Sequence, residues 1–261
     1  MEQLKFILNN IVNLPLFPLL YYQGKKIRAN VPELPEAQKP TGTSGDGSPS
    51  LRLLGLGEST IAGIGVDFHS KGFTGHLARL LAEQTKRQID WQVVARSGYT
   101  AKKVRERLVP KLSTAPLDII VIGLGGNDTF KLSSPRHWQQ EISALITELQ
   151  ARFPAVKIVF ANVPPIRSFP AFTPLAKFVL GRQIDLLHQV LVKLVKEHSQ
   201  VWYVSERIRL SYWLEHFKEE AYTPHDFFSD GVHPSELTYR TWAAEVANFI
   251  MAKNILLQHT T

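Results

Sequence analysis

The sequence predicts an α/β fold with a central, mainly parallel sheet. Short apolar runs of strand length alternate with segments whose apolar residues recur at helical spacing. Several of the apolar runs end in glycine, as strands do where they enter a loop. The chain has 261 residues, of which 44% are hydrophobic and 20% charged, enough for one sizeable core. We therefore expect one α/β domain preceded by a tail.

Residues 1–31 form an apolar and basic segment ahead of this domain. Asparagines and prolines interrupt its apolar run, so it is a poor match to a spanning helix or a secretory signal. One interpretation is a tail helix packed on the domain. The other is an interfacial segment that makes peripheral contact with a membrane. It would place five side chains at the level of the lipid headgroups: Tyr21, Tyr22, Lys25, Lys26 and Arg28.

Residues 32–50 are rich in proline, glycine and serine, which is typical of a linker. The compact domain is therefore expected to begin near Leu51 and to extend over residues 51–261. The predicted organisation is thus an N-terminal segment, a linker and a catalytic domain.

Strand and helix patterns alternate through residues 51–261. The strand-like runs are 51–56, stopped by Gly57; 91–95, ending at Gly98; 118–124, nearly all apolar; 156–163, stopped by two prolines; and the short 201–204. The helix-like segments are 73–86, with leucines at helical spacing; 101–109, polar and stopped by Pro110; the amphipathic 138–153; 184–195; and 234–252. This order predicts βαβ units with right-handed crossovers, so the carboxyl ends of the strands share one edge.

Composition excludes several classes of protein. The chain has no cysteine, so it has no disulfide framework, thiolate nucleophile or Cys-ligated metal. Its net charge is +7, but the basic residues are dispersed, and no zinc-finger or RNA-binding signature occurs, so we expect no nucleic-acid partner. The absence of cysteine does not fix the compartment, because such a chain tolerates either redox state. We expect a cytoplasmic or peripherally membrane-associated protein, and secretion stays open.

The chemistry is expected around Ser59, which follows the first apolar strand in a glycine-rich turn. A side chain at the carboxyl end of a parallel strand lies where open α/β sheets bind ligands. If a helical turn begins just after it, free backbone N–H groups point at whatever Ser59 attacks. The alternative is a serine that only caps a tight turn.

Other unusual groups lie at strand ends or before the last helix. Gly98 and Asn127 follow two further strands, and Asp230 and His233 stand three residues apart in a loop. In a turn, that spacing lets the carboxylate reach Nδ1 of the imidazole and leaves Nε2 free to take a proton from a serine. His225 is a rival base, but the Asp-x-x-His spacing favours His233.

Together these blocks resemble the SGNH hydrolases, also called the GDSL esterase/lipase family. They occur in the family's order over roughly residues 51–250: Gly57-Glu58-Ser59 with Gly63, then Gly98, then Gly125-Gly126-Asn127-Asp128, then Asp230-x-x-His233. The resemblance implies a flavodoxin-like, three-layer α/β/α sandwich. The family usually has aspartate before the serine, where this chain has Glu58, so the hydrogen bonds of this acid to the turn are expected to differ from the family's.

The resemblance also implies a catalytic triad of Ser59, Asp230 and His233. It implies an oxyanion hole made by the backbone N–H groups of Ser59 and Gly98 and the side-chain amide of Asn127. The mechanism would be acyl transfer to water through an acyl-enzyme, without metal or organic cofactor. Asp128 is expected only to cap its loop.

The substrate is less readable than the mechanism. A small or lipid-like ester is the leading prediction, because the proline-rich loop of residues 164–175 is apolar and could line an acyl pocket, act as a lid or pack on the core. A carbohydrate O-deacetylase is the alternative, since the family includes such enzymes. A catalytically silent binding module of the same fold is the third, although it would not need all five site residues. The aromatic residues of 212–217 and 227–228 could cover the site or simply pack.

Overall fold

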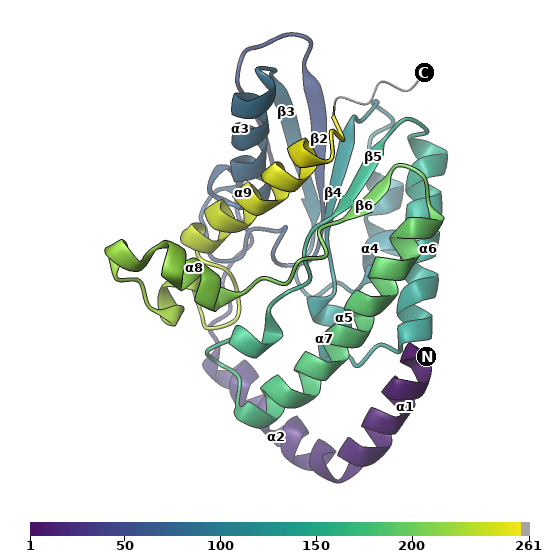
Figure 1. The fold of residues 1–261 in the computed structure, drawn as a ribbon, viewed down its shortest axis with the longest axis vertical. Coiled ribbons are helices and arrows are strands. Elements are labelled where there is room, and N and C mark those ends of the chain that lie inside the picture. Colours follow the sequence, from purple (N-terminus) through teal and green to yellow (C-terminus); the bar gives the residue numbers. More distant parts are fainter. Residues whose placement is uncertain (257–261) are drawn as a thin grey trace.

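A computed structural model describes residues 1–256 and confirms the α/β fold (Figure 1). Its six-stranded sheet has the order β1-β3-β2-β4-β5-β6, in which β1 is antiparallel to β3 and the other neighbours are parallel. The strands are β1 Thr41–Ser44, β2 Leu51–Gly57, β3 Ile89–Ala95, β4 Ile119–Gly123, β5 Lys157–Phe160 and β6 Val201–Tyr203. The last five residues of the predicted domain lie outside the described part of the chain.

The α-helices in the described residues are α1 Glu2–Asn13, α2 Phe17–Asn30, α3 Phe73–Thr85, α4 Ala101–Arg107, α5 Gly126–Phe130, α6 Pro135–Arg152, α7 Pro174–Leu194, α8 Leu210–His216 and α9 Glu236–Ala252. Side-chain oxygens of Ser134 and Thr173 cap α6 and α7, and a proline occupies the first turn of each helix. The sequence predicts that this helix starts at residue 184, but α7 begins ten residues earlier, directly after its cap residue Thr173.

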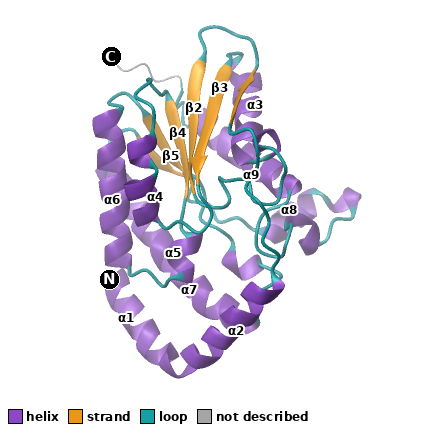
Figure 2. Cartoon of the chain, turned by 180° about the vertical axis from the view of Figure 1, so that it is seen from behind, coloured by secondary structure: helices purple, strands orange, loops and turns teal. Residues whose placement is uncertain are grey.

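Two cores on opposite faces of the sheet produce the three-layer sandwich (Figure 2). Alternate strand residues point to opposite faces. Leu54 and Ile120 join the core under α4, α6 and α7, whereas Leu53 and Val121 join the core under α3 and α9. Strands buried on both faces explain why the central runs are almost wholly apolar.

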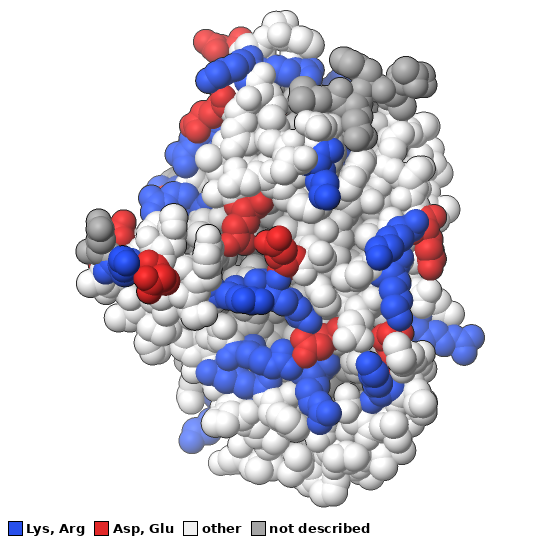
Figure 3. All heavy atoms as spheres, in the orientation of Figure 1, with Lys and Arg blue, Asp and Glu red and all other residues white. Residues whose placement is uncertain are grey.

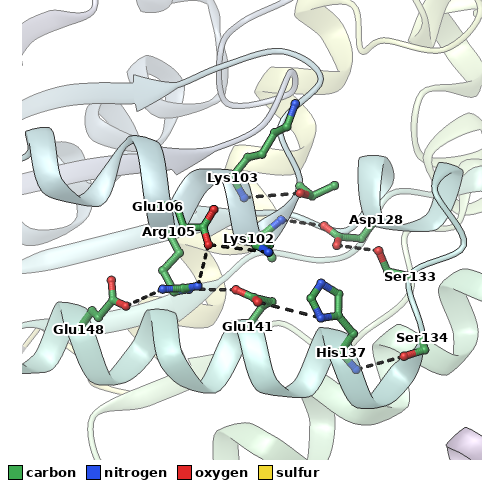
Figure 4. A network of polar contacts seen from close by, with 12 residues as sticks. Lys102, Lys103, Arg105, Glu106, Asp128, Ser133, Ser134, His137, Glu141 and Glu148 are labelled. Atoms are coloured by element: carbon green, nitrogen blue, oxygen red, sulfur yellow. Dashed lines mark hydrogen bonds and ion pairs between the residues drawn. The ribbon is translucent and has the colours of Figure 1, made fainter.

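Polar contacts tie α4 and α6 together on one face of the sheet (Figure 4). Arg105 on α4 donates to Glu141 and Glu148 of α6, each at 2.9 Å. The buried Asp128 accepts from the backbone N–H of Ala101 at 2.8 Å and from Ser133 Oγ at 3.0 Å. Asp128 therefore caps its loop, as predicted, and in addition holds the start of α4.

Part of the predicted linker belongs to the sheet. Thr41–Ser44 pairs with β3 as the edge strand β1, so the sheet begins ahead of Leu51. Residues just before it are docked as well, because Ala37 N–H donates to Ala62 O and Gln38 N–H to Asp67 O. The prediction of a linker was wrong for these residues because β1 is a short, half-exposed strand of Thr, Gly and Ser. It lacks the apolar run that marks the central strands. The division into domains stays a prediction.

The N-terminal segment is helical and arcs around one end of the molecule (Figure 1). A 3-10 turn, Leu14–Leu16, joins α1 to α2, with Pro15 and Pro18 at the bend. The run Glu2–Asn30 is long and apolar enough to cross a membrane by length and composition, contrary to our expectation. Only 6% of its most apolar window is buried against the rest of the chain, so it is not a tail helix packed by its apolar side.

Candidate active site

Ser59 lies in a tight turn directly after β2. The backbone N–H groups of Ile61 and Ala62 both donate to Glu58 O, at 3.0 and 2.9 Å, so a helical turn begins at the predicted position. Within the described residues, the N–H groups of Ser59 and Thr60 have no protein acceptor. Free N–H donors next to a half-buried serine hydroxyl are what a developing oxyanion needs.

The parallel register places the end of β3, three residues ahead of Gly98, beside the strand end that leads to Ser59. Gly57 of β2 is paired with Ala95 of β3 on one side and with Gly123 of β4 on the other, so the three strands end at one level. Gly98 follows β3 in an exposed turn with φ of +77°, a left-handed conformation that favours glycine. Its N–H also has no acceptor among the described residues.

Asn127 stands at the start of α5, after β4, and its side chain is held by Glu58. Glu58 Oε2 accepts from both the backbone N–H and the side-chain Nδ2 of Asn127, at 2.9 and 2.7 Å, and Oε1 accepts from Gly126 N–H at 2.7 Å. The Glu58 side chain comes close to the backbone of Gly126, since a Cβ on Gly126 would lie 2.9 Å from Glu58 Oε1. One hydrogen of the Asn127 amide is thus used for positioning, and the other is left for a ligand.

Glu58 is a site residue whose function the sequence did not reveal. Its side chain is buried, and burial raises its pKa to about 7, against the opposing effect of the three N–H donors from Gly126 and Asn127. The nearby carboxylate of Asp128 raises the pKa further. The acid before the serine therefore fixes the asparagine 69 residues later in the chain.

Asp230 and His233 are hydrogen-bonded in the loop before α9. Asp230 Oδ2 lies 2.7 Å from His233 Nδ1, and Asp230 Oδ1 accepts from the backbone N–H groups of Val232 and His233, at 2.9 and 2.7 Å. The Asp230 side chain is fully shielded from solvent, whereas that of His233 is 23% exposed. Burial alone would raise the pKa of Asp230, but the hydrogen bonds from His233 and Val232 outweigh it and hold the pKa below its usual range.

The loop of Asp230 and His233 is attached to the turn of Ser59. Ser229 Oγ donates to Pro234 O at 2.9 Å and lies 3.3 Å from Gly65 O, and Tyr239 of α9 donates to Ile64 O at 2.8 Å. These contacts hold the loop of Asp230 and His233 against residues 64 and 65, which follow Ser59 in the same turn region. Among the described residues, no hydrogen bond joins Ser59 Oγ to His233 Nε2, a contact that is often long without substrate.

A narrow apolar pocket opens between the Ser59 turn, the 164–175 loop and the His233 loop. It is lined by Thr60, Pro164, Pro165, Phe169, Ile208, Leu210, Trp213, Phe228, Val232, Pro234, Thr238 and Trp242. The 164–175 loop both lines this pocket and packs on the core, where Ile166 and Phe169 are buried. Of the aromatic residues upstream, Trp213 and Phe227 are buried and stack on each other, while Tyr212 is exposed.

The remaining candidates are separate from this site. His225 is exposed and bonds no carboxylate among the described residues, so Asp230 pairs with His233 and not with the rival. A more open hollow along α6, beside Arg136 and Glu148, contains none of the predicted site residues. The described residues include no group of three or more His, Cys, Asp or Glu side chains placed to hold a metal ion.

The sequence matches the model of the GDSL-like lipase/acylhydrolase family over residues 56–241, which is most of the chain. The chain belongs to this family. The family is described as one of lipases and acylhydrolases. The matched range includes every candidate site residue, from Ser59 to His233.

Individual relatives agree with this membership. The esterase TesA of Pseudomonas aeruginosa is 30% identical over 115 residues, which are 43% of this chain and 55% of the esterase, so the match spans about half of that relative. A crystal structure of TesA has a TM-score of 0.58 at 22% identity, covering 77% of this chain and 98% of the other. A Clostridium thermocellum family 3 carbohydrate esterase has a TM-score of 0.58 at 18% identity, covering 80% and 98%. At such identities the structural likeness supports the sandwich fold alone.

Proposed function

We propose that this family member cleaves carboxylic esters through an acyl-enzyme formed on Ser59. The observation that carries the proposal is the hydrogen-bonded Asp230–His233 pair, held by its loop against the residues that follow Ser59. Ser59 Oγ attacks the ester carbonyl, and His233 Nε2 takes the hydroxyl proton and returns it to the departing alkoxide. Water then attacks the acyl-enzyme in the same way, with His233 again as base, and releases the acid.

The developing oxyanion is stabilised by three donors. Two are the backbone N–H groups of Ser59 and Gly98, which have no protein acceptor among the described residues. The third is the Asn127 side-chain amide, oriented by Glu58. Fixed donors in a partly buried site stabilise charge without having to reorient during the reaction.

The pocket that Thr60 helps to line supports one substrate class. Its lining of prolines, aromatic residues and aliphatic side chains suits an acyl chain or an aryl group better than a sugar, which would leave hydroxyl groups without partners. We therefore favour small or lipid-like esters over acetylated carbohydrates.

A substrate panel and a covalent probe test the proposal. Aryl esters of increasing acyl length should be turned over faster than acetylated sugars, and a fluorophosphonate should label the protein once, at Ser59. Faster deacetylation of the sugars would favour the carbohydrate esterase alternative. If the folded protein shows no labelling and no turnover, it is a silent binding module, and the proposal is overturned.

Replacing Asn127 with alanine should lower kcat by about 10²–10³, because one oxyanion donor is lost. KM should change less, since this bond strengthens as the carbonyl oxygen gains charge. Single-turnover acylation and thermal unfolding should be measured on the same preparation. If Asn127 only supports its loop, the variant will lose stability while its folded fraction acylates at the wild-type rate.

Replacing Glu58 with glutamine should also lower kcat, although Glu58 does not touch the substrate. Glutamine has one acceptor oxygen, so its NH₂ group would face the N–H of Gly126 or those of Asn127, and the Asn127 amide would lose its fixed orientation. Glu58→Asp keeps a carboxylate and is the matched control, so its kcat should exceed that of Glu58→Gln. Equal rates for the two variants would show that the carboxylate does not position Asn127.

The stability of Glu58→Gln should differ from wild type in a pH-dependent way. Burial raises the pKa of Glu58 from 4.5 to about 7, so ionising it is costlier in the folded chain than in the unfolded one. The contribution of Glu58 to the free energy of unfolding is complete below pH 4.5 and falls as the pH rises through about 7. Denaturant unfolding of both proteins across this range should show wild type losing stability relative to the glutamine variant.

A further inference from the structure

The N-terminal helix α1 is amphipathic, but its apolar stripe faces away from the protein. Leu4, Ile7, Leu8 and Ile11 recur at helical spacing and are all exposed, with Leu8 52% and Ile11 62% accessible. A helix on a protein surface normally turns such a stripe inward. Here the apolar surface is left without a partner in the described chain.

Polar groups, in contrast, hold the segment to the domain. Glu2 on the inner side of α1 bonds Lys193 of α7 at 2.8 Å, and Gln3 Oε1 accepts from Arg136 N–H of α6 at 3.1 Å. Asn13 is the buried residue of α1. The orientation is thus fixed by specific contacts, and it presents the apolar side outward.

The bend continues this surface onto α2 with aromatic and basic residues. Leu19, Tyr21 and Tyr22 are exposed, and Lys25 Nζ lies 5.3 Å from the centre of the Tyr21 ring. On the face seen in Figure 3, the end of the molecule where α1 and α2 lie is almost free of charged side chains, and lysines and arginines border this area. Apolar surface flanked by tyrosine and basic residues is the composition of helices that lie in a membrane interface.

Charge decides between a lipid surface and a second copy of the chain. Four basic residues lie in residues 1–30, namely Lys5, Lys25, Lys26 and Arg28, and the sole acidic residue, Glu2, is paired with Lys193. Two copies meeting through this face would bring like charges together, on chains that each carry a net charge of +7. Anionic headgroups complement the same charges.

The surface is also connected to the candidate active site. Thr173, at the end of the 164–175 loop, donates to Gln23 of α2 at 2.6 Å. In the same loop, Ala171 N–H donates to Gly231 O, between Asp230 and His233, at 3.1 Å. A lipid surface touching α2 would therefore lie next to the loop that lines the apolar pocket.

We propose that α1 and α2 form a docking surface for anionic lipid bilayers, lying in the interface with the apolar stripe buried and Lys25, Lys26 and Arg28 at the headgroups. The bend at Pro15 and Pro18 suits a segment that lies along the surface better than a straight spanning helix. This inference does not depend on the chemistry at Ser59.

The test is co-sedimentation of the full chain with vesicles of phosphatidylcholine alone or with anionic phosphatidylglycerol added. Wild type should bind the anionic vesicles more tightly than the neutral ones. Leu8→Glu with Ile11→Glu should reduce binding by more than about 100-fold, because two apolar anchors become charged. Lys25→Ala with Lys26→Ala should reduce it about 30-fold, at about 1 kcal/mol for each basic residue. Tyr212→Glu, an exposed aromatic position on α8, is the matched control and should bind as wild type does.

Turnover of a soluble ester by the same preparations separates this proposal from the catalytic one, because all these variants should keep wild-type rates. Three results would overturn the docking proposal. The first is that Leu8→Glu with Ile11→Glu binds the vesicles as tightly as wild type. The second is that wild type without lipid is a dimer, which this double substitution converts to monomer. The third is that the membrane-bound protein resists alkaline extraction, which would indicate a spanning helix.

Discussion

Ser59→Ala should abolish ester hydrolysis and labelling by a fluorophosphonate, with a loss in kcat of about 10⁶. The Ser59 hydroxyl is the only side-chain group in the proposed mechanism that forms a bond to the acyl carbon, so no neighbouring side chain replaces it. The fold should be retained, because among the described residues the Ser59 side chain makes no hydrogen bond and is half-buried. Thermal unfolding and a burst assay with an aryl ester, performed on one preparation, measure both effects.

Ser70→Ala is a suitable control for this variant. Ser70 is an exposed serine in the short helix His69–Lys71, outside the proposed machinery, and its loss should leave turnover unchanged. Wild-type turnover by a Ser59→Ala protein purified from cells free of host esterases would remove the serine mechanism. A loss of activity that merely follows a loss of folded protein would also count against it.

The central sheet was predictable from the sequence because β2 and β4, its central parallel strands, are mostly apolar runs that end in recognisable turns. Burial on both faces requires such runs, and the parallel topology then forces their carboxyl ends to one edge. For this reason the sequence alone predicts that Ser59, Gly98 and Asn127 lie close together. The Asp230–His233 pair was also predictable, because a spacing of three residues in a turn lets the carboxylate reach Nδ1 of the imidazole.

What could not be predicted depends on contacts between distant residues. β1 has no apolar pattern because an exposed edge strand buries little, and its pairing with β3 is set by the position of the sheet edge. The clamp of Glu58 on Asn127 joins residues from two strand ends, so nothing near Glu58 in the sequence indicates it. The sequence pattern of α1 predicts an amphipathic helix but not which side faces the protein. That orientation is decided by Glu2 and Gln3 and their partners on α7 and α6.

Asp230→Asn should be folded and slow, with kcat reduced about 10⁴-fold, and the backbone around Asp230 explains why the effect is so large. The N–H groups of Val232 and His233 both donate to Asp230 Oδ1, so an asparagine there must place its oxygen toward them. Its NH₂ group then faces His233 Nδ1, which is forced to accept. The ring proton moves to Nε2, and His233 can no longer take the proton of Ser59.

The geometry of the variant distinguishes this explanation from a loss of structure. Because the amide keeps the two backbone hydrogen bonds, the thermal unfolding midpoint of Asp230→Asn should stay closer to wild type than that of Asp230→Ala, which loses them. Asp226→Asn is the control in the same loop, where the exposed carboxylate bonds only Thr223 among the described residues, and its kcat should be unchanged. Near wild-type kcat/KM in Asp230→Asn would mean that His233 does not depend on Asp230 for its tautomer, and the proposed triad would be reduced to a serine and a histidine.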